Sequence, residues 1–271
     1  VKIFILIISL YGLEIFMQFL KALILGLVHG FGEFLPVSSS GNIYFFSNLM
    51  NTSADTLSFD ILVHTASLIA IVLLFYKDWL HIIKNKFSPF NRNLLISCIP
   101  SIIITIIFQK KIETYFYVSR AFGLCFIFTG AVLFYETMYR PGKKSLKGMN
   151  VKDSFIIGVF QMFGNIPGVS RVGLTVCGGL QQGYNGKAAV KYAYLLSVPA
   201  LIGRIVADLI QIYSRTSEPV ITDVFGFFPM LIAFVAAFAA SVVAIRLMQR
   251  LAGKAKFRGF AYYLFALGII T

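Results

Sequence analysis

The side chains of this chain that are best suited to chemistry lie in two short polar stretches within apolar sequence. Residues 27–42 read Leu-Val-His-Gly-Phe-Gly-Glu-Phe-Leu-Pro-Val-Ser-Ser-Ser-Gly-Asn, and residues 165–175 read Asn-Ile-Pro-Gly-Val-Ser-Arg-Val-Gly-Leu-Thr. Both share one plan, with an apolar lead-in, a proline, serine, a charged residue and glycine. We therefore predict one buried site built from both stretches, which binds a phosphate-bearing lipid head group.

Arg171 is the residue of the second stretch most suited to binding an anion. A cation near the middle of a membrane costs at least about 2.5 kcal/mol on insertion scales, so its presence there indicates function. Gly168 lets the backbone approach a ligand closely, and Ser170 and Thr175 supply hydroxyl groups. Because a guanidinium binds phosphate through two parallel hydrogen bonds, we predict a phosphate site here.

Glu33 follows His29 by one helical turn, so both side chains can share a helix face. A carboxylate beside an imidazole can bind a divalent metal ion or transfer protons. Structural alternatives stay open for both groups. The pair could simply pack against the second stretch, and Arg171 could form a structural ion pair with Glu33 or Asp60.

Three consecutive serines, Ser38, Ser39 and Ser40, close the first stretch. Their hydroxyl groups could cap a broken helix, or one of them could be a nucleophile activated by a nearby base. We favour capping for Ser40 and leave catalysis or phosphate contact open for the other two. Asn42 could orient a phosphate through its amide or close the turn.

Two further polar pairs lie within apolar segments. His64 follows Asp60 by one turn, and Arg204 precedes Asp208 by one turn. A histidine in such a position is more often a hydrogen-bonded core residue than a ligand, so we favour that interpretation of His64 over a functional one. The arginine and the aspartate are interpreted as a structural ion pair.

The composition indicates a membrane protein. The 271 residues are 58% hydrophobic and 13% charged, with a mean hydropathy of +0.82, whereas a soluble domain usually carries about 25% charged residues. Long apolar segments recur along the chain, which is typical of an all-α polytopic membrane protein. We predict a single transmembrane domain over residues 1–271. The expected spans are residues 1–20, 59–76, 94–108, 121–139, 192–213, 224–247 and 259–271.

Two broken hairpins are expected between these spans. Residues 21–35 form a helix that reaches about half a bilayer before the chain returns through 38–50. Residues 1–20 are either a span of their own or a lead-in to this helix. The residues expected to break the helix are Gly30, Gly32, Pro36 and Gly41. Residues 154–183 form the second hairpin. Non-helical backbone at this depth must be buried in protein or line a wet cavity.

Basic residues set the expected topology. Residues 77–92, 140–152 and 246–258 hold more than half of the 24 Lys and Arg residues, which predicts that these loops are cytoplasmic. The formal charge of +13 is thus explained by the membrane, and no nucleic-acid partner is expected. The hairpins then enter from opposite faces, which indicates inverted repeats over about 21–139 and 153–271.

Residues 33–41 and 167–171 resemble the two signatures of the bacitracin-resistance type undecaprenyl-diphosphatases. Residues 59–70, Pro100 and residues 191–203 are also similar to that family. The resemblance implies a multi-pass hydrolase of the cell membrane that removes the terminal phosphate of undecaprenyl diphosphate and so recycles the carrier lipid for cell-envelope synthesis. It implies two interlocked inverted repeats, a divalent cation, Mg²⁺ or Ca²⁺, and a site that opens to the outer face. Whether the protein forms a homodimer stays open.

The resemblance covers Glu33, Ser38, Ser39, Ser170, Arg171 and Thr175, and together with the residue types above it gives the following expected roles. Glu33, helped by His29, would bind the cation or act as the base, and Ser39 or a water would attack phosphorus. The expected substrate-binding residues are Arg171, Ser170, Thr175, Ser38, Asn42 and Gly168.

The sequence departs from the family at three positions. His29 stands where the family has Glu or Gln, Asn42 where it usually has His, and Val172 where it usually has Ser. With His29 in place of the acid and Asn42 in place of the imidazole, the site could keep a proton-transfer pair in exchanged form. It could equally mark a prenyl-phosphate binding protein or flippase that does not hydrolyse its ligand.

Overall fold

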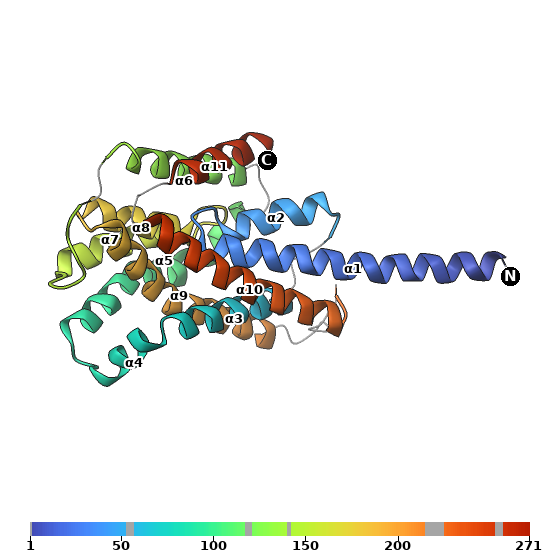
Figure 1. The fold of residues 1–271 in the computed structure, drawn as a ribbon, viewed down its shortest axis with the longest axis horizontal. Helices are drawn as coiled ribbons and strands as arrows, with labels where there is room; N and C mark the ends of the chain where they lie inside the picture. Colours follow the sequence, from blue (N-terminus) through green and yellow to red (C-terminus); the bar gives the residue numbers. More distant parts are fainter. Residues whose placement is uncertain (1, 53–56, 117–120, 140–141, 215–224, 253–256) are drawn as a thin grey trace.

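The computed structural model describes residues 2–52, 57–116, 121–139, 142–214, 225–252 and 257–271, without the side chains of residues 2–11, 109–116 and 121. Within these ranges the chain forms α-helices joined by turns and contains no strand (Figure 1). The helices are α1 (Lys2–Phe34), α2 (Ser39–Leu49), α3 (Leu57–Leu74), α4 (Tyr76–Lys84), α5 (Pro89–Phe116), α6 (Ala121–Glu136), α7 (Val151–Phe163), α8 (Arg171–Gln181), α9 (Gly186–Ser214), α10 (Phe227–Ala252) and α11 (Arg258–Ile270).

Five of these helices contain segments long and apolar enough to cross a membrane, and α6 and α11 are shorter apolar helices. Large apolar side chains remain exposed along the bundle, as expected for a surface that faces lipid. The predicted all-α, multi-pass membrane architecture is confirmed. The candidate spans are Gly12–Phe34, Leu57–Leu74, Pro89–Phe108, Gly186–Ser214 and Phe227–Ala252.

The prediction that the first hairpin begins with a half-length helix was wrong. Helix α1 runs without interruption to Phe34, so most of residues 1–20 form the start of this helix and not a separate span, while Val1 lies outside the described residues. The apolar segment Gly12–Phe34 has 23 residues. At 1.5 Å per residue, roughly 35 Å, it is long enough to cross the hydrocarbon core.

Gly30 and Gly32 do not break α1, contrary to prediction; they allow close packing. A Cβ on Gly30 would lie 2.3 Å from the carbonyl oxygen of Ala237 on α10, and a Cβ on Gly32 would lie 2.7 Å from the Cα of Ser39 on α2. Side chains at these positions would push the neighbouring backbones apart. Gly41 likewise lies inside α2, so only the segment from residue 35 to residue 38 interrupts the first hairpin.

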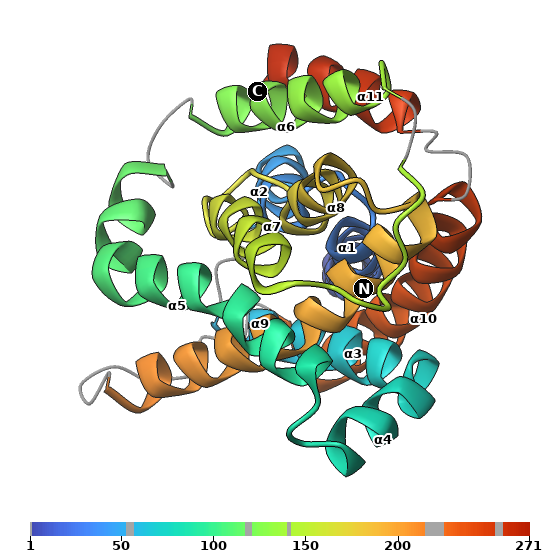
Figure 2. The ribbon, with the colours of Figure 1, turned by 90° about the vertical axis from the view of Figure 1, so that its left-hand side faces the viewer.

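The two broken hairpins form the centre of the molecule. Helices α1 and α2 meet at the turn around Pro36, and α7 and α8 meet at the turn around Pro167. Figure 2 shows these four helices surrounded by α3, α5, α9 and α10, with α6 and α11 packed together along one side. Both predicted hairpins are therefore present, and the surrounding helices shield their non-helical turns. The inverted-repeat relation between the two halves stays a prediction.

The first predicted basic loop contains a helix of its own. Helix α4 carries Lys77 and Lys84 and has no buried residue, and Asp78 on it forms an ion pair with Lys191 of α9, with a Nζ–Oδ1 distance of 2.6 Å. Figure 1 places α4 and the start of α7 at the end of the bundle opposite the N-terminus. The basic-loop residues that lie outside the described ranges are Arg140, Lys254 and Lys256.

Candidate active site

The centre of the site is an ion pair between the two hairpins. Helix α1 ends just after Glu33 because Leu35 precedes a proline, which disfavours helical backbone. Helix α8 begins at Arg171 because the Ser170 hydroxyl accepts a hydrogen bond from the Gly173 N–H at 3.1 Å. Arg171 Nη2 pairs with Glu33 Oε1 at the point where these two helix ends meet. The side chain of Glu33 is 4% exposed and that of Arg171 is 19% exposed.

Ser39 contacts the same carboxylate from a third helix end. Its hydroxyl donates to Glu33 Oε2 with an oxygen–oxygen distance of 2.5 Å. The turn before it is sharp, because Ser38 has a φ of 66°, a conformation that few non-glycine residues adopt. Ser38 also caps α2 by accepting from the Gly41 N–H at 3.3 Å. The turn thus aims one serine at the helix backbone and the next at Glu33.

A hydrogen bond joins the tips of the two hairpins. The backbone N–H of Gly168 donates to Ser40 Oγ at 3.2 Å. Gly168 has a φ of +87°, which a side chain would strain, and a Cβ there would lie 2.9 Å from the Cβ of Cys125. Ser40 therefore fixes one tip against the other, and does not act as the helix cap that we favoured.

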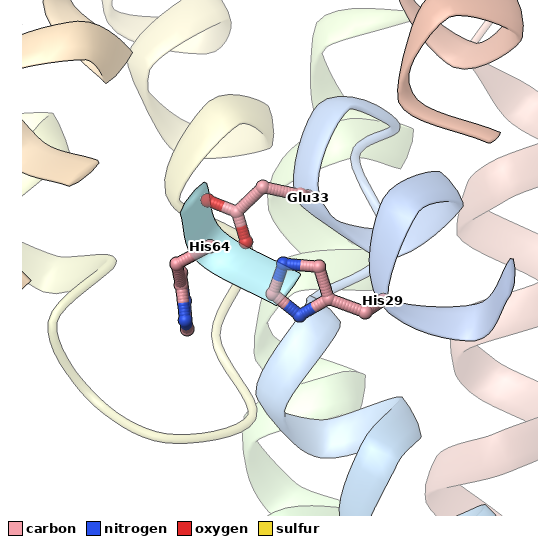
Figure 3. Close-up of side chains that lie close together, drawn as sticks. All are labelled: His29, Glu33 and His64. Carbon is pink, nitrogen blue, oxygen red and sulfur yellow. The ribbon is translucent and has the colours of Figure 1, made fainter. Parts of the chain in front are cut away.

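His29 and His64 complete a cluster with Glu33. One ligand atom from each of the three residues lies within 4.8 Å of the others, and the two imidazole ring centroids are 4.6 Å apart, edge to face. Figure 3 shows the three side chains around one point. The favoured interpretation of His64 as an ordinary core residue missed this neighbourhood. One feature of the sequence could have indicated a role for His64, because the segment 59–70 that contains it also resembles the family.

A cavity of about 380 Å³ opens beside this cluster, within the size range of small-ligand sites. Arg171 and Arg204 both line it, so two guanidinium groups face the same space. Three lining residues carry buried polar atoms that have no hydrogen-bond partner among the described residues; these atoms are Arg171 Nε, Gln161 Oε1 and Ser101 Oγ. Unpaired buried polar atoms are costly, so the cavity suits a polar ligand at this end.

Four of the residues predicted from sequence line the cavity, namely Glu33, Ser38, Ser39 and Arg171. The other predicted substrate-binding residues lie just behind it and hold the local backbone. Thr175 Oγ1 donates to the carbonyl of Arg171 at 2.7 Å, inside α8. Ser170 caps that helix, and Gly168 bonds to the opposite hairpin tip.

Asn42 is fully engaged within the fold. Its Nδ2 donates to the carbonyls of Val37 and Ser38 at 2.7 and 2.8 Å, and its Oδ1 accepts from the Tyr263 hydroxyl of α11. Asn42 was expected either to orient a phosphate or to close the turn, and these hydrogen bonds show that it closes the turn.

Arg204 and Asp208 form the ion pair predicted from their spacing, with a Nε–Oδ2 distance of 3.1 Å. Arg204 Nη2 also lies 3.5 Å from Asp60 Oδ2, so it links α9 to α3. The sequence did not predict that this arginine also faces the cavity. That follows from the packing of α9 against the second hairpin, which has no local signature.

Comparison with known proteins agrees with this geometry. A family model described as Bacitracin resistance protein BacA matches residues 22–270. The chain is 33% identical to the undecaprenyl-diphosphatase of Carboxydothermus hydrogenoformans over 253 residues, which cover 93% of this chain and 96% of that protein. It is 32% identical to the undecaprenyl-diphosphatase of Methanosphaera stadtmanae, over 94% of this chain and 97% of that protein. Since the match extends over nearly the whole chain, this protein belongs to the BacA family.

Proposed function

We propose that this protein is an undecaprenyl-diphosphatase, which hydrolyses a polyprenyl diphosphate within the membrane to the monophosphate and inorganic phosphate. The observation that carries the proposal is the pairing of Arg171 and Glu33 from opposite hairpins at the polar end of a cavity inside the helix bundle. Family membership and the names of the relatives support the same activity.

The diphosphate is held by the two guanidinium groups of the cavity. Arg171 begins α8, so the free N–H groups of that helix end reinforce its positive charge. Arg204 reaches the same cavity from α9. In this proposal the terminal phosphate displaces Glu33 as the partner of Arg171, and phosphoryl charge is neutralised by groups already in place.

Ser39 is the proposed nucleophile. Its hydroxyl already donates to Glu33 Oε2, so the carboxylate can accept the proton as Ser39 Oγ attacks the terminal phosphorus. The bond between that phosphorus and the bridging oxygen breaks, which releases the prenyl monophosphate. Water then hydrolyses the phosphoserine. If water attacks directly instead, Glu33 accepts its proton and no phosphoserine forms.

The residues of the site fit a divalent cation. Glu33 supplies a carboxylate, and His29 supplies a buried Nε2 that has no hydrogen-bond partner among the described residues. A bound cation would be held by these two residues together with His64, and would neutralise charge on the phosphoryl oxygens.

The site is proposed to open toward the outer face of the cell membrane. If the basic segments are cytoplasmic, then α5 and α9 each begin at the inner face. The cavity is lined by the middle of α5, from Cys98 to Ile106, and by the second half of α9, from Pro199 to Ala207. These positions lie away from the basic ends, as a site for recycling the carrier lipid from outside requires.

Phosphate release from undecaprenyl diphosphate tests the proposal. Detergent-purified protein should release phosphate in the presence of a divalent cation, and Arg171→Ala should lower the release at least about 100-fold. The control is Arg250→Gln, because Arg250 is exposed at the end of α10 and lies outside the site. A protein that binds the lipid and releases no phosphate across pH and cations would be the carrier that the sequence left open.

A further inference from the structure

We propose that His29, Glu33 and His64 form a binding site for a transition-metal ion of the zinc class, in preference to Mg²⁺ or Ca²⁺. The inference rests on the proposed function, since it identifies the metal of the same site. It departs from the hard cation that the family resemblance implies, because it follows from the side chains that this chain itself carries.

The donor atoms converge from two helices. His29 and Glu33 lie four residues apart on α1, so they present ligands on one helix face. His64 approaches from α3, and the three donor atoms lie within 4.8 Å of one another (Figure 3). An ion bound tetrahedrally at 2.0–2.2 Å from each donor needs donor atoms roughly 3.3–3.6 Å apart. The three donor atoms would reach this spacing by moving closer together through small side-chain rotations.

The unbonded nitrogen of His29 is a second indication of a ligand. His29 is 2% exposed, and its Nε2 has no hydrogen-bond partner among the described residues. A buried imidazole nitrogen without a partner costs free energy unless something binds it. The Glu33 carboxylate and the His64 imidazole lie beside it, so a cation fits this position.

His64 is oriented as metal-binding histidines usually are. Its Nδ1 lies 2.7 Å from the backbone carbonyl oxygen of Asp60. A carbonyl only accepts, so Nδ1 carries the proton and Nε2 keeps its lone pair for a metal ion. The same hydrogen bond fixes the plane of the ring. One backbone contact thus sets both the tautomer and the direction of this ligand.

The donor types select the metal. Mg²⁺ and Ca²⁺ bind almost entirely through oxygen, and Ca²⁺ takes six to eight oxygen ligands in typical sites. Imidazole nitrogen suits zinc, copper, iron and nickel, and two histidines with one carboxylate form a frequent catalytic zinc set with a position left open. Glu33 and His64 line the cavity while His29 lies behind them, so the open position would face the substrate.

The existing contacts of Glu33 leave room for this role. Its two oxygens accept from Arg171 and Ser39, whereas an ionised carboxylate offers about four lone-pair positions. A diphosphate that draws Arg171 away from Glu33 would free one more position. Metal binding and diphosphate binding should therefore strengthen each other.

Metal content provides a test that does not depend on activity. The full chain, purified without a polyhistidine tag and stripped with a chelator, is equilibrated with equal concentrations of Zn²⁺, Mg²⁺ and Ca²⁺. Bound ions are counted by mass spectrometry after gel filtration. We expect one Zn²⁺ per chain, and a Co²⁺-loaded sample should show the visible absorption bands of nitrogen and oxygen coordination.

The variants His29→Gln and His64→Gln should each weaken Zn²⁺ binding at least about tenfold. The control is His81→Gln, because His81 is the third histidine of the chain and is exposed on α4. Stoichiometric Mg²⁺ or Ca²⁺ with little Zn²⁺ in the native protein would overturn the inference, and so would unchanged Zn²⁺ binding in both site variants. The native measurements stand even if a variant misfolds.

Phosphate release, measured separately, distinguishes the two proposals. Hydrolysis that proceeds with Mg²⁺ in a protein that does not bind Zn²⁺ would overturn the metal assignment and leave the proposed function intact. Stoichiometric Zn²⁺ without hydrolysis under any metal would support the metal site and overturn the phosphatase.

Discussion

Arg171 forms an ion pair with Glu33 across 138 residues of sequence, and so joins the first turn of α8 to the last turn of α1. Removing one partner of a buried ion pair leaves an uncompensated charge, which typically costs about 3–5 kcal/mol. The pair therefore serves the fold when no substrate is bound. The same guanidinium lines the cavity, and its Nε has no hydrogen-bond partner among the described residues, so it can also receive a phosphate.

The first prediction concerns this guanidinium. Arg171→Ala should lower phosphate release at least about 100-fold, because one fixed donor to a developing anion is worth that much. Arg171→Lys should keep the positive charge but lose two-point binding, so its rate should fall between those of the native protein and Arg171→Ala. Single-turnover phosphate release measures the effect. Activity near the native level in Arg171→Ala would show that phosphate is held elsewhere.

The second prediction separates two adjacent serines. Ser39→Ala should reduce phosphate release at least about 1,000-fold, since it removes the proposed nucleophile. Ser40→Ala should mainly lower stability, by about 1 kcal/mol, because it removes the hydrogen bond between the hairpin tips. Radiolabelled substrate quenched in acid should leave phosphate on the native chain. If Ser39→Ala remains active, water is the nucleophile.

The third prediction concerns the ligand exchange at residue 29. His29→Glu replaces an imidazole with a carboxylate, so the site should shift its preference from Zn²⁺ toward Mg²⁺ by about tenfold or more. Competition between the two ions for the purified variant measures the shift. The restored acid should also increase Mg²⁺-supported hydrolysis, and a rise in activity would mean that the native residue limits the enzyme with that ion. An unchanged ratio of the two affinities would contradict the role given to this side chain.

The fourth prediction uses two glycines of the same helix. Gly30→Ala should lower the thermal unfolding midpoint, because its Cβ would lie 2.3 Å from the carbonyl oxygen of Ala237 and overpacking typically costs about 1–3 kcal/mol. Gly12→Ala is the matched control, since no atom of the described part of the chain lies within 4 Å of its Cβ position. That change should be neutral or slightly stabilising, given the helix preference of alanine. Equal midpoints for the two variants would mean that α1 and α10 are less closely packed than described.

The fifth prediction concerns the second guanidinium of the cavity. Arg204→Gln should raise KM about tenfold and change kcat less, because this arginine contributes to binding more than to the reacting phosphoryl group. Its ion pair with Asp208 complicates the single variant. The double variant Arg204→Gln/Asp208→Asn removes both charges, and KM should stay raised in it. Recovery of the native KM in the double variant would assign the effect to the ion pair instead.

The positions of the hairpin turns could be predicted because proline acts locally. Pro36 and Pro167 restrict the backbone beside them whatever surrounds them, and both turns lie where they were expected. Glycine gives no such local signal. The sequence predicts a helix break at Gly30, whereas this glycine lets α1 approach α10, and that contact joins residues about 200 positions apart.

The meeting of Glu33 with Arg171 could be predicted from the expected topology, but the neighbours of the pair could not. His64 lies 31 residues beyond Glu33 on another helix, so its position in the cluster follows from the packing of α3 and not from a local pattern. Ser170 and Thr175 were expected to face the phosphate, and their hydroxyls hold the backbone of α8 instead. Serine and threonine hydroxyls often bond to the nearby helix backbone and are then not directed at a ligand, and the sequence alone does not show which of the two occurs.

The distance along the chain between Glu33 and its counterion has a consequence for biogenesis. When the first hairpin leaves the ribosome, the arginine that will neutralise its carboxylate has not been synthesised. A lone anion in lipid is costly, so this hairpin can settle at its final depth only once the second hairpin has been inserted beside it. A truncated chain that ends before α7 would carry the acid and a serine beside it and still lack an anion-binding pocket, so the catalytic centre is completed late in membrane insertion.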